Sequence, residues 1–583
     1  MKQFLKFTFA SCLGFLLSFF TICIIVAIVI VATVTGFSSK QITVAPNSVL
    51  KIEFNGVLKE QARDMSFFDA WSSTNITELG IHDIIKSIQH AKTDENIVGI
   101  WLQMDLFSAG NASISEIRDA LVDFKKSGKF IIAYGDNYTQ QLYYLATVAD
   151  KIFIHPSGTI ELKGLASKPI FFKNALQKVG VDMQVVKVGD YKGAPEMYTN
   201  NAMSDENKAQ TKNIINQLWR KMCTNIASER NISIEQIESL VEKSVMFAPT
   251  KSYVTEGLVD SLLYPDELVS YFKTHIDSTY NEEKQMVSYG DYIVLASQNK
   301  SNNNKIAVLY ANGGIDDGDI EGIDSEELSK LLSETRKDSS IKAVVLRINS
   351  PGGSAFGAER IWRETSLFKG VKPLVVSMGD YAASGGYYIA TQADSIFSNT
   401  ETLTGSIGIF GIIPNFSKIS EKFGITYDPQ TTHTLADFPS FTRDMTTYER
   451  NILERYITDN YQLFLHRCSE GRSITKAALL PLAGGRVWTG SDALTHGLVD
   501  KIGGLQQAIQ SAARMASITS YEVEHLPKKK TVWESMLEDT TIQIQSLLTK
   551  NIPLHEYRLI RSFIDNKTRI IIQARMEENS EIW

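Results

Sequence analysis

The sequence has few of the residues that hold disulfide frameworks and metal ions. Its 583 residues include only four cysteines, and no two of them stand in a C-x-x-C motif. Cys223 and Cys468 fall at nearly equivalent positions of two predicted helices, where we expect small buried hydrophobic residues rather than reactive thiols. Because no motif for a metal or a nucleotide is present, we expect neither a metal site nor a cofactor.

An excess of positive charge is also lacking. The chain carries 59 lysines and arginines against 66 aspartates and glutamates, which gives a formal net charge of -7. No run of basic residues is interleaved with aromatic residues, so we expect no nucleic-acid partner. At 583 residues the chain is too long for one hydrophobic core, and two or more domains are expected.

Charged residues are absent from Phe7 to Ser39, directly after two lysines. About 20 apolar residues cross a bilayer, whereas the apolar region of a cleavable signal peptide has only about 7–15 residues. We therefore predict an uncleaved transmembrane helix over residues 7–37, with residues 1–6 in the cytoplasm and the rest across the membrane. A cleaved signal peptide is the weaker alternative, and it would also export the body of the protein.

The remainder of the chain alternates strand-like and helix-like stretches, which predicts βαβ units around a mostly parallel sheet. The pattern occurs twice, because Ile97–Met104 resembles Ile341–Ile348 and the Gly-Asp and Tyr-Tyr pairs that follow recur at the same spacing of 244 residues. We predict an α/β protein built by tandem duplication. The first repeat covers residues 48–290 and the second residues 300–517, and an extension at residues 518–583 has no counterpart in the repeats.

A turn of small residues in the second repeat carries Ser384. The apolar segment Pro373–Met378 is typical of a buried strand and a helix can follow the turn, so Ser384 and Gly385 stand at a strand-to-helix corner. Backbone N–H groups are free at such a corner, and the G-x-S-x-G elbow holds its nucleophile in the same setting. The alternative is a serine that only caps the helix. Since the first repeat has Gln140 at this position, which a purely structural turn would not require, we predict that Ser384 is a nucleophile.

A glycine loop, Ser350-Pro-Gly-Gly353, follows the predicted strand Ile341–Ile348. The first repeat has Leu106-Phe-Ser-Ala109 at the corresponding positions, without a glycine. We predict that the N–H groups of Gly353 and Gly385 hold the oxyanion of an acyl-transfer transition state. One such donor typically stabilises the transition state by ~3–4 kcal/mol. The alternative is an ordinary strand-to-helix turn that binds no ligand.

A serine nucleophile needs a proton acceptor, and no histidine stands in the right place. None of the nine histidines lies between Tyr387 and Tyr427, and His433 and His496 are the weak candidates that remain. A lysine is the other option, because Ser-Lys pairs are a known variant of the catalytic triad. Such a lysine must be neutral, which requires a pKa lowered from ~10.4 by burial, and spacing alone does not select it.

Three motifs resemble those of the bacterial signal peptide peptidase A family in its long form, also called protease IV. They are Asn349–Gly353, Gly379–Gly386 and Leu403–Gly411, and the resemblance extends from about Val49 to Ala516. It implies a Clp-protease/crotonase-like β-α superhelical fold in each repeat.

The same resemblance assigns the general base to Lys192, in Val188-Gly-Asp-Tyr-Lys192. The next residue, often serine in the family, is Gly193 here. The duplication agrees with this assignment, because the second repeat has Ala436 at the corresponding position. Each repeat would then keep one member of a Ser-Lys dyad.

By this resemblance the protein is a membrane-anchored serine endopeptidase that degrades cleaved signal peptides and other peptides. It implies a single-pass protein of the bacterial inner membrane with its catalytic domains on the periplasmic side. A homo-oligomer, a tetramer in the family, is also implied. The rival functions are a crotonase-type acyl-CoA enzyme, which would give Ser384 no role, and a non-catalytic scaffold that binds peptides.

Overall fold

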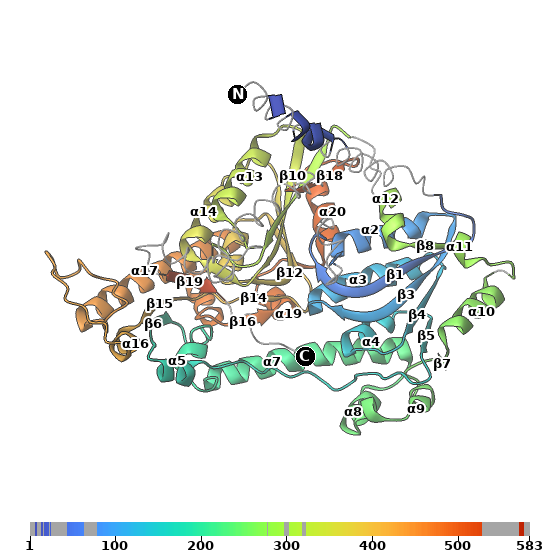
Figure 1. The fold of residues 1–583 in the computed structure, drawn as a ribbon, viewed down its shortest axis with the longest axis horizontal. Coiled ribbons are helices and arrows are strands. Elements are labelled where there is room, and N and C mark those ends of the chain that lie inside the picture. The colour runs from blue at the N-terminus through green and yellow to red at the C-terminus, as the bar shows by residue number, and fades with distance from the viewer. Residues whose placement is uncertain are drawn as a thin grey trace.

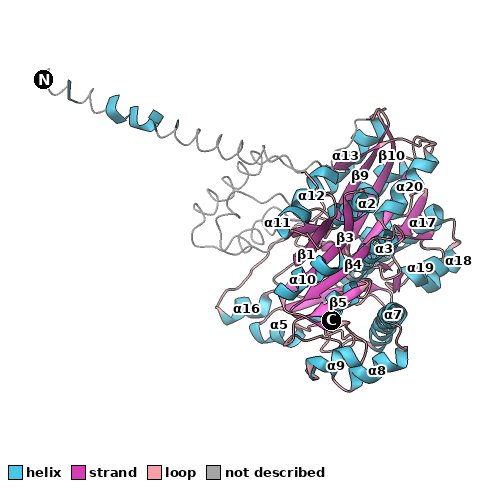
Figure 2. Ribbon diagram, turned by 90° about the vertical axis from the view of Figure 1, so that its right-hand side faces the viewer, coloured by secondary structure: helices cyan, strands magenta, loops and turns pink. Residues whose placement is uncertain are grey.

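The computed structural model describes residues 43–62, 78–276, 278–296, 302–316 and 322–527, the backbone of a strand at Ile571–Arg575, and short helical pieces within the first 24 residues. Two sheets form the body, and helices surround them (Figures 1 and 2). Most of the transmembrane helix predicted at residues 7–37 lies outside the described residues. Within the described part of the chain, no helix combines the length and the apolar character that crossing a bilayer requires.

The first sheet has the order β2-β1-β3-β4-β5-β7, with β8 paired to β1, and all its strand pairs are parallel. Its strands are β1 (Ser48–Lys59), β2 (Glu78–Gly80), β3 (Ile97–Ser108), β4 (Phe130–Gly135), β5 (Lys151–Ile154), β7 (Ser261–Leu262) and β8 (Met286–Ser288). The central strands are buried over most of their length, as expected for parallel strands covered by helices on both faces.

The second sheet repeats this arrangement. Its order is β16-β14-β12-β10-β9-β18, with β13 paired to β12 and β17, and only the β14–β16 pair is antiparallel. Its strands are β9 (Lys305–Asn312), β10 (Ile341–Ser350), β12 (Leu374–Ala383), β13 (Ser395–Ser398), β14 (Leu403–Gly405), β16 (Val487–Thr489), β17 (Lys501–Ile502) and β18 (Glu522–Leu526). The run β9-β10-β12-β13-β17 corresponds to β1-β3-β4-β5-β7, and the α/β architecture predicted from the alternation is confirmed.

The extension differs from the prediction at its start. Strand β18 pairs in parallel with β9, as β8 pairs in parallel with β1 in the first sheet. The first residues of the extension therefore complete the second sheet and do have a counterpart in the first. The sequence gives only weak evidence for the correspondence of β18 with β8. Both are short edge strands, and Glu522–Leu526 mixes charged with apolar residues.

Helices also recur in pairs. The corresponding helices are α2 (Ile81–Thr93) and α13 (Ser325–Lys337), α3 (Asn111–Lys125) and α14 (Ala355–Ser366), α4 (Gln140–Ala146) and α15 (Gly385–Ala390), α7 (Asp205–Arg230) and α17 (Thr447–Arg472), α9 (Thr250–Thr255) and α19 (Gly490–Thr495), and α10 (Pro265–His275) and α20 (Leu505–Met515). The others are α5 (Lys173–Val179), α6 (Glu196–Thr199), α8 (Ile234–Glu242), η1 (Val245–Phe247), α11 (Glu282–Gln285), α12 (Tyr289–Ala296), α16 (Ser417–Lys422), α18 (Lys476–Leu479) and η2 (Leu480–Leu482). Cys223 in α7 and Cys468 in α17 are fully buried, which confirms their predicted role as small core residues.

A third sheet joins the two repeats. Its order is β11 (Gly352–Ser354), β19 (Ile571–Arg575), β15 (Ile409–Asn415) and β6 (Asp182–Val188), and all its pairs are antiparallel. Strand β6 comes from the first repeat and pairs along seven residues with β15 of the second. This pairing carries the end of β6 to the edge of the second sheet (Figure 1).

Candidate active site

The structure brings Ser384 and Lys192 into direct contact within one chain. The Lys192 Nζ lies 2.7 Å from the Ser384 Oγ, although the two residues come from different repeats. Both side chains are buried, with 0% of Ser384 and 1% of Lys192 exposed. A buried amine beside a buried hydroxyl is the geometry that a Ser-Lys nucleophile and base require.

Ser384 stands at a sharp corner between β12 and α15. Its backbone has φ 55° and ψ -115°, a conformation that costs a residue with a Cβ of the order of 1–3 kcal/mol. Two hydrogen bonds hold it there, because the Ser384 N–H donates to the Gly405 carbonyl at 2.8 Å and the Tyr388 N–H donates to the Ser384 carbonyl at 2.9 Å. A methyl group on Gly386 would lie 2.6 Å from the Ser350 carbonyl oxygen, so the turn needs a glycine in order to pack against the glycine loop.

Lys192 follows β6 and lies between glycines of the second repeat. A methyl group on Gly485 would lie 2.6 Å from the backbone nitrogen of Lys192, and a methyl group on Gly408 would lie 3.3 Å from the Lys192 Cδ. The Tyr191 N–H donates to the Gly484 carbonyl at 3.1 Å, which fixes the turn that carries the lysine. Close approach of these glycines therefore fixes the backbone and the aliphatic part of Lys192.

The surroundings of the Lys192 amine favour its neutral form. Besides Ser384, the Nζ lies 3.2 Å from the Ser406 Oγ and 3.4 Å from the Ser406 carbonyl oxygen. Burial lowers the pKa of Lys192 well below its ordinary value, and no neighbouring carboxylate among the described residues opposes this effect. A neutral amine has a free electron pair, so it can accept the Ser384 proton.

Ser406 is a site residue that the sequence analysis did not single out. It adopts φ 49°, its N–H donates to the Arg486 carbonyl at 2.7 Å, and its side chain is buried against the amine. The comparison of repeats that marked Ser384 also applies here, because the first repeat has Leu162 at the corresponding position. A hydroxyl in place of a buried leucine is the signal that would have found it.

Gly193 does not deprive the amine of a hydroxyl partner. A side chain at this position would meet the amide of Asn207 at 3.0 Å, and that amide donates to Glu196. Residue 193 therefore faces Asn207, whereas Ser406 supplies the second hydroxyl beside Lys192.

The glycine loop lies beside the Ser384 corner. Gly353 has φ +148°, and a methyl group on it would lie 2.3 Å from the Ile315 carbonyl, which accepts a 2.7 Å hydrogen bond from the Ser354 N–H. Gly385 is the first residue of α15, so its N–H has no acceptor within the helix. The pairing of Ser350 with Ala382 joins the loop to β12 next to the Ser384 corner. The assignment of the Gly353 and Gly385 N–H groups as oxyanion donors stays a prediction.

The two histidine candidates lie elsewhere. His433 is exposed and contacts the Thr432 hydroxyl, and the His496 ring packs against Trp488. The basic group that contacts the Ser384 hydroxyl is the Lys192 amine.

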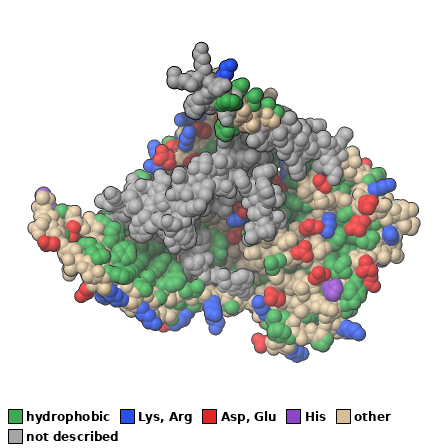
Figure 3. All heavy atoms as spheres, viewed as in Figure 1, with side chains coloured by type: hydrophobic (Ala, Val, Ile, Leu, Met, Phe, Trp, Pro, Cys, Tyr) green, Lys and Arg blue, Asp and Glu red, His purple; other side chains and the backbone are tan. Residues whose placement is uncertain are grey.

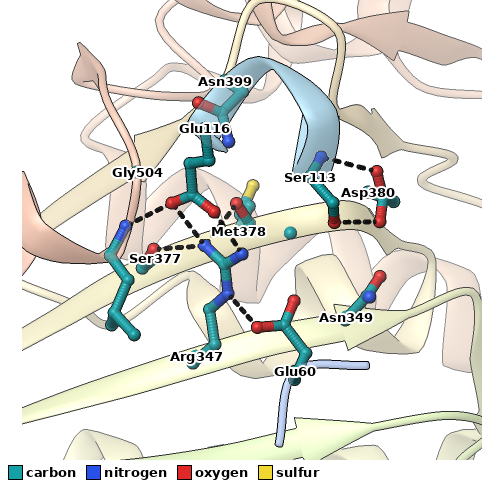
Figure 4. Close-up of polar contacts among 12 residues, drawn as sticks. Glu60, Ser113, Glu116, Arg347, Asn349, Ser377, Met378, Asp380, Asn399 and Gly504 are labelled. Carbon is teal, nitrogen blue, oxygen red and sulfur yellow. Dashed lines mark hydrogen bonds and ion pairs between the residues drawn. The ribbon is translucent and has the colours of Figure 1, made fainter. Parts of the chain in front are cut away.

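Buried charges connect the two repeats behind this site (Figure 4). The Arg347 guanidinium in β10 is fully buried and pairs with Glu60 at 2.9 Å and Glu116 at 2.7 Å, both from the first repeat. It also donates to the Ser377 hydroxyl in β12 at 2.9 Å. Burial raises the pKa of Glu60, and the arginine opposes part of this rise. One cation therefore binds two carboxylates of the first repeat to the strands that lead to Ser384.

A second contact fixes the end of β12. The Asp380 carboxylate accepts hydrogen bonds from the N–H of Ser113 at 3.0 Å and from its hydroxyl at 2.6 Å, at the start of α3 (Figure 4). A methyl group on Gly110 would lie 2.0 Å from the Asp380 Cγ, so the close approach needs this glycine. A carboxylate at a helix N-terminus is favourable because the helix dipole is positive there. The strand that carries Ser384 is thus bound to the repeat that carries Lys192.

Known proteins resemble the chain along most of its length. Protease 4 of Haemophilus influenzae is 32% identical over 556 residues, covering 90% of this chain and 89% of that protein. A putative signal peptide peptidase SppA of Enterococcus faecium is 32% identical over 230 residues, covering 38% of this chain and 67% of that protein. Among solved structures, ClpP1 from Listeria monocytogenes matches with a TM-score of 0.22 at 16% identity, covering 34% of this chain and 91% of that one, which is too weak to carry an argument.

The model of peptidase family S49 matches residues 123–279 and 366–519, one segment in each of the two repeats. The second segment contains Ser384 and the first contains Lys192. A match over more than half of the sequence, together with the long alignment to Protease 4, leads to one assignment. The chain belongs to peptidase family S49, and it is a serine peptidase.

Proposed function

We propose that the chain is an endopeptidase that degrades cleaved signal peptides with a Ser-Lys dyad. Ser384 is the nucleophile and Lys192 is the general base. The observation that carries this proposal is the 2.7 Å contact between a buried hydroxyl and a buried amine whose pKa is lowered by burial. The Lys192 amine lies within proton-transfer distance of the Ser384 hydroxyl, and its lowered pKa favours the neutral form that can accept a proton.

In the first half of the reaction, the Ser384 Oγ attacks the peptide carbonyl carbon while the Lys192 amine takes the hydroxyl proton. The resulting tetrahedral oxyanion lies against the N–H groups of Gly353 and Gly385. Lys192, now an ammonium, gives the proton to the leaving amine as the peptide C–N bond breaks. Water then attacks the acyl-enzyme, with Lys192 again accepting a proton and returning it to Ser384.

Ser406 assists the base in both halves. Its hydroxyl and carbonyl oxygens lie 3.2 Å and 3.4 Å from the Lys192 Nζ, so they accept hydrogen bonds from the ammonium once it forms. A buried ammonium without such partners is costly, because desolvation penalises the charged form. The serine therefore stabilises the charge that develops as the reaction proceeds.

Signal peptides are the proposed substrates because one relative of the chain is named a putative signal peptide peptidase. The charge-free stretch at Phe7–Ser39 supports a single-pass anchor at residues 7–37 in the bacterial inner membrane. The catalytic repeats would then lie on the periplasmic side, where cleaved signal peptides remain in the adjacent bilayer. A Clp-protease/crotonase-like fold in each repeat is part of the same proposal.

Exposed apolar side chains support a homo-oligomer. They gather on the face that carries α5, α16 and the start of α17, where Figure 3 shows a broad apolar area. The exposed apolar side chains at α5, at α16 and just after α16 include Phe172, Val179, Phe423, Ile425 and Tyr427, of which Phe423 is 77% exposed. Contiguous exposed apolar patches mark interaction sites in soluble domains. We propose that it is covered by another copy of the chain.

The test is hydrolysis of a fluorogenic signal-sequence peptide by the full chain. We expect Ser384→Ala and Lys192→Met each to abolish hydrolysis while thermal unfolding stays cooperative. Full activity in either variant would exclude the dyad. The same pair of variants also decides against the rivals, because neither a peptide-binding scaffold nor an acyl-CoA enzyme would lose peptide hydrolysis through these substitutions.

A further inference from the structure

A chain of hydrogen-bonded side chains connects the turn that carries Lys192 with the second repeat. It begins at Glu196, whose N–H donates to the Gly193 carbonyl at 2.8 Å, so its backbone belongs to the turn. The Glu196 side chain is buried, with 3% exposed. One of its carboxylate oxygens accepts from the Ser204 N–H at 3.0 Å and the other from the Asn207 side-chain amide at 2.9 Å, both at the start of α7. Glu196 therefore fixes the turn to this helix.

The connection continues through two amides of α7. The Asn207 Oδ1 accepts from the Gln210 Nε2 at 3.4 Å, and the Gln210 Oε1 accepts from the Val487 N–H of β16 at 2.9 Å. Helix α7 passes beneath β16 to make this contact (Figure 1). Val487 pairs with Gly405, whose carbonyl accepts the Ser384 N–H at 2.8 Å. The connection therefore ends beside the Ser384 corner.

These three side chains, Glu196, Asn207 and Gln210, form what we call the α7 relay, and one arrangement satisfies its polar atoms. Glu196 at one end is a carboxylate, which only accepts hydrogen bonds, and the Val487 N–H at the other end only donates. Each amide must therefore turn its nitrogen toward Glu196 and its oxygen toward Val487. The relay is sensitive to a single reversed group, because two acceptors or two donors would then face each other in a buried site.

The corresponding helix of the second repeat uses its matching residue differently. Asn207 is the third residue after the N-cap Ser204 of α7, and Glu449 has the same place after the N-cap Thr446 of α17. The Glu449 carboxylate accepts from the Thr446 N–H at 2.7 Å and completes a capping box, the usual task of this position. Asn207 turns its amide to Glu196 instead. The departure from ordinary capping occurs in the repeat that carries Lys192.

The α7 relay also accounts for the glycine that follows Lys192. A methyl group on Gly193 would lie 3.0 Å from the Asn207 Nδ2 and 3.2 Å from its Cγ. Asn207 is only 6% exposed and is hydrogen-bonded on both sides, so it has little room to give way. The place that a side chain at residue 193 would need is therefore occupied by the relay.

We propose that Asn207 and Gln210 are positioning residues of the peptidase, and that the α7 relay sets the distance between the Lys192 amine and the Ser384 hydroxyl. This inference rests on the proposed function, because it takes Lys192 as the base. The pairing of β6 with β15 ends at Val188, ahead of the turn, so the turn needs an anchor of its own. A displacement of about 1 Å at a reacting group can lower a rate about 100-fold.

Exchanging the two ends of the hydrogen bond between Glu196 and Asn207 tests the relay. In Glu196→Gln one donor must face another, and in Asn207→Asp one acceptor faces another. The double variant Glu196→Gln/Asn207→Asp again has one donor and one acceptor, with the net charge unchanged. We measure kcat and KM of the full chain for a fluorogenic signal-sequence peptide. Each single variant should lower kcat at least about tenfold with KM within about twofold, and the double variant should return kcat to within about threefold of native.

Asn213→Asp is the matched control, because it makes the same substitution at an exposed position of α7 and should leave kcat unchanged. Unfolding midpoints report whether a low kcat comes from a damaged fold. Helix α7 has a second attachment to β16 and α19, since Gln217 accepts from the Thr489 hydroxyl at 2.8 Å and donates to Asp492 at 2.9 Å. Should a single variant still not fold, Gln210→Met breaks the relay at an uncharged link and should lower kcat at least about threefold with KM unchanged.

The outcomes separate this inference from the proposed function. Native kcat in the single variants, a rise in KM without a fall in kcat, or a double variant no more active than the less active single variant would each overturn the relay. If Lys192→Met abolishes hydrolysis while Asn207→Asp keeps native kcat, the dyad stands and the relay fails. Full activity of Lys192→Met would instead exclude the dyad and leave the relay without a base to position.

Discussion

Replacing Ser406 with alanine tests how the buried amine works as a base. The Lys192 Nζ has three oxygen neighbours, the hydroxyls of Ser384 and Ser406 and the Ser406 carbonyl, at 2.7, 3.2 and 3.4 Å. None of them is charged, so among the residues that the structure describes, these three oxygen atoms are what stabilises the ammonium that forms during the reaction. Ser406→Ala removes one of them and keeps the Cβ, which leaves the left-handed backbone at this position as it was.

The magnitude follows from the strength of a hydrogen bond to a charged group. Such a bond contributes about 1.5–3 kcal/mol. Losing it should lower kcat/KM about 10- to 150-fold at the pH where the native enzyme is fully active. The same loss disfavours the protonated form of the free enzyme, so the already lowered pKa of Lys192 falls further, by about one unit for each 1.4 kcal/mol.

The assay is a pH profile of kcat/KM for a fluorogenic peptide. Lys192 acts as a base only when neutral, so activity rises with pH through its pKa. For Ser406→Ala we therefore expect a lower plateau reached at a lower pH than in the native enzyme. Ser406→Thr keeps the hydroxyl and should retain more activity than Ser406→Ala, and unfolding midpoints report whether either variant is damaged. A profile displaced to higher pH, or an unchanged plateau, would refute the reasoning.

Three further predictions concern the groups around the dyad. Burial lowers the pKa of Lys192 on folding, so the unfolded chain binds this proton more tightly than the folded chain, and the resulting cost in stability shrinks as the pH rises toward ~10.4. Lys192→Met should therefore raise the unfolding midpoint at pH 7 by a margin that narrows above pH 9. An equal margin at both pH values would contradict this reasoning. Gly485→Ala places a methyl group 2.6 Å from the Lys192 backbone nitrogen, at a residue with φ +85°, so kcat should fall at least tenfold. The control is Gly370→Ala, which has a similar φ of +75° but lies in open space and should leave kcat unchanged. Similar kcat values for the two variants would refute this prediction. Arg347→Met leaves two buried carboxylates without their cation, so it should lower the free energy of unfolding, measured in urea, by about 3–5 kcal/mol. A decrease below about 1 kcal/mol would show instead that the two carboxylates are protonated.

The fold was predictable from sequence to the extent that it depends on local pattern. Apolar segments between helical stretches predicted the parallel strands, and the spacing of 244 residues predicted that the arrangement occurs twice. The third sheet was not predictable in this way. Pairing of β6 with β15 depends on how the two repeats pack, and β19 joins them from a segment more than 150 residues away in sequence. No local pattern encodes such a partner.

The site divides along the same line. Ser384 and the glycine loop could be found because they differ from the first repeat at matched positions. Lys192 could be assigned only through a family resemblance, since its place beside Ser384 results from the antiparallel pairing between repeats. Ser406 and Gly485 carry no chemical motif of their own. Their roles are visible only in the folded structure, where Gly485 packs against the Lys192 backbone and the Ser406 hydroxyl contacts the Lys192 amine.

The corresponding corner of the first repeat is closed by the side chain of Gln140. There the Gln140 amide donates to the Gly164 carbonyl at 3.1 Å, and its oxygen accepts from the N–H groups of Lys163 and Gly164 at 3.0 and 2.9 Å. A long amide thus connects the corner to the loop that follows it. In the second repeat Ser384 is too short to make these bonds, and the space before the equivalent Gly408 receives an amine from the other repeat instead. The same fold therefore closes this corner with its own side chain in the first repeat and leaves it open to an amine from the other repeat in the second.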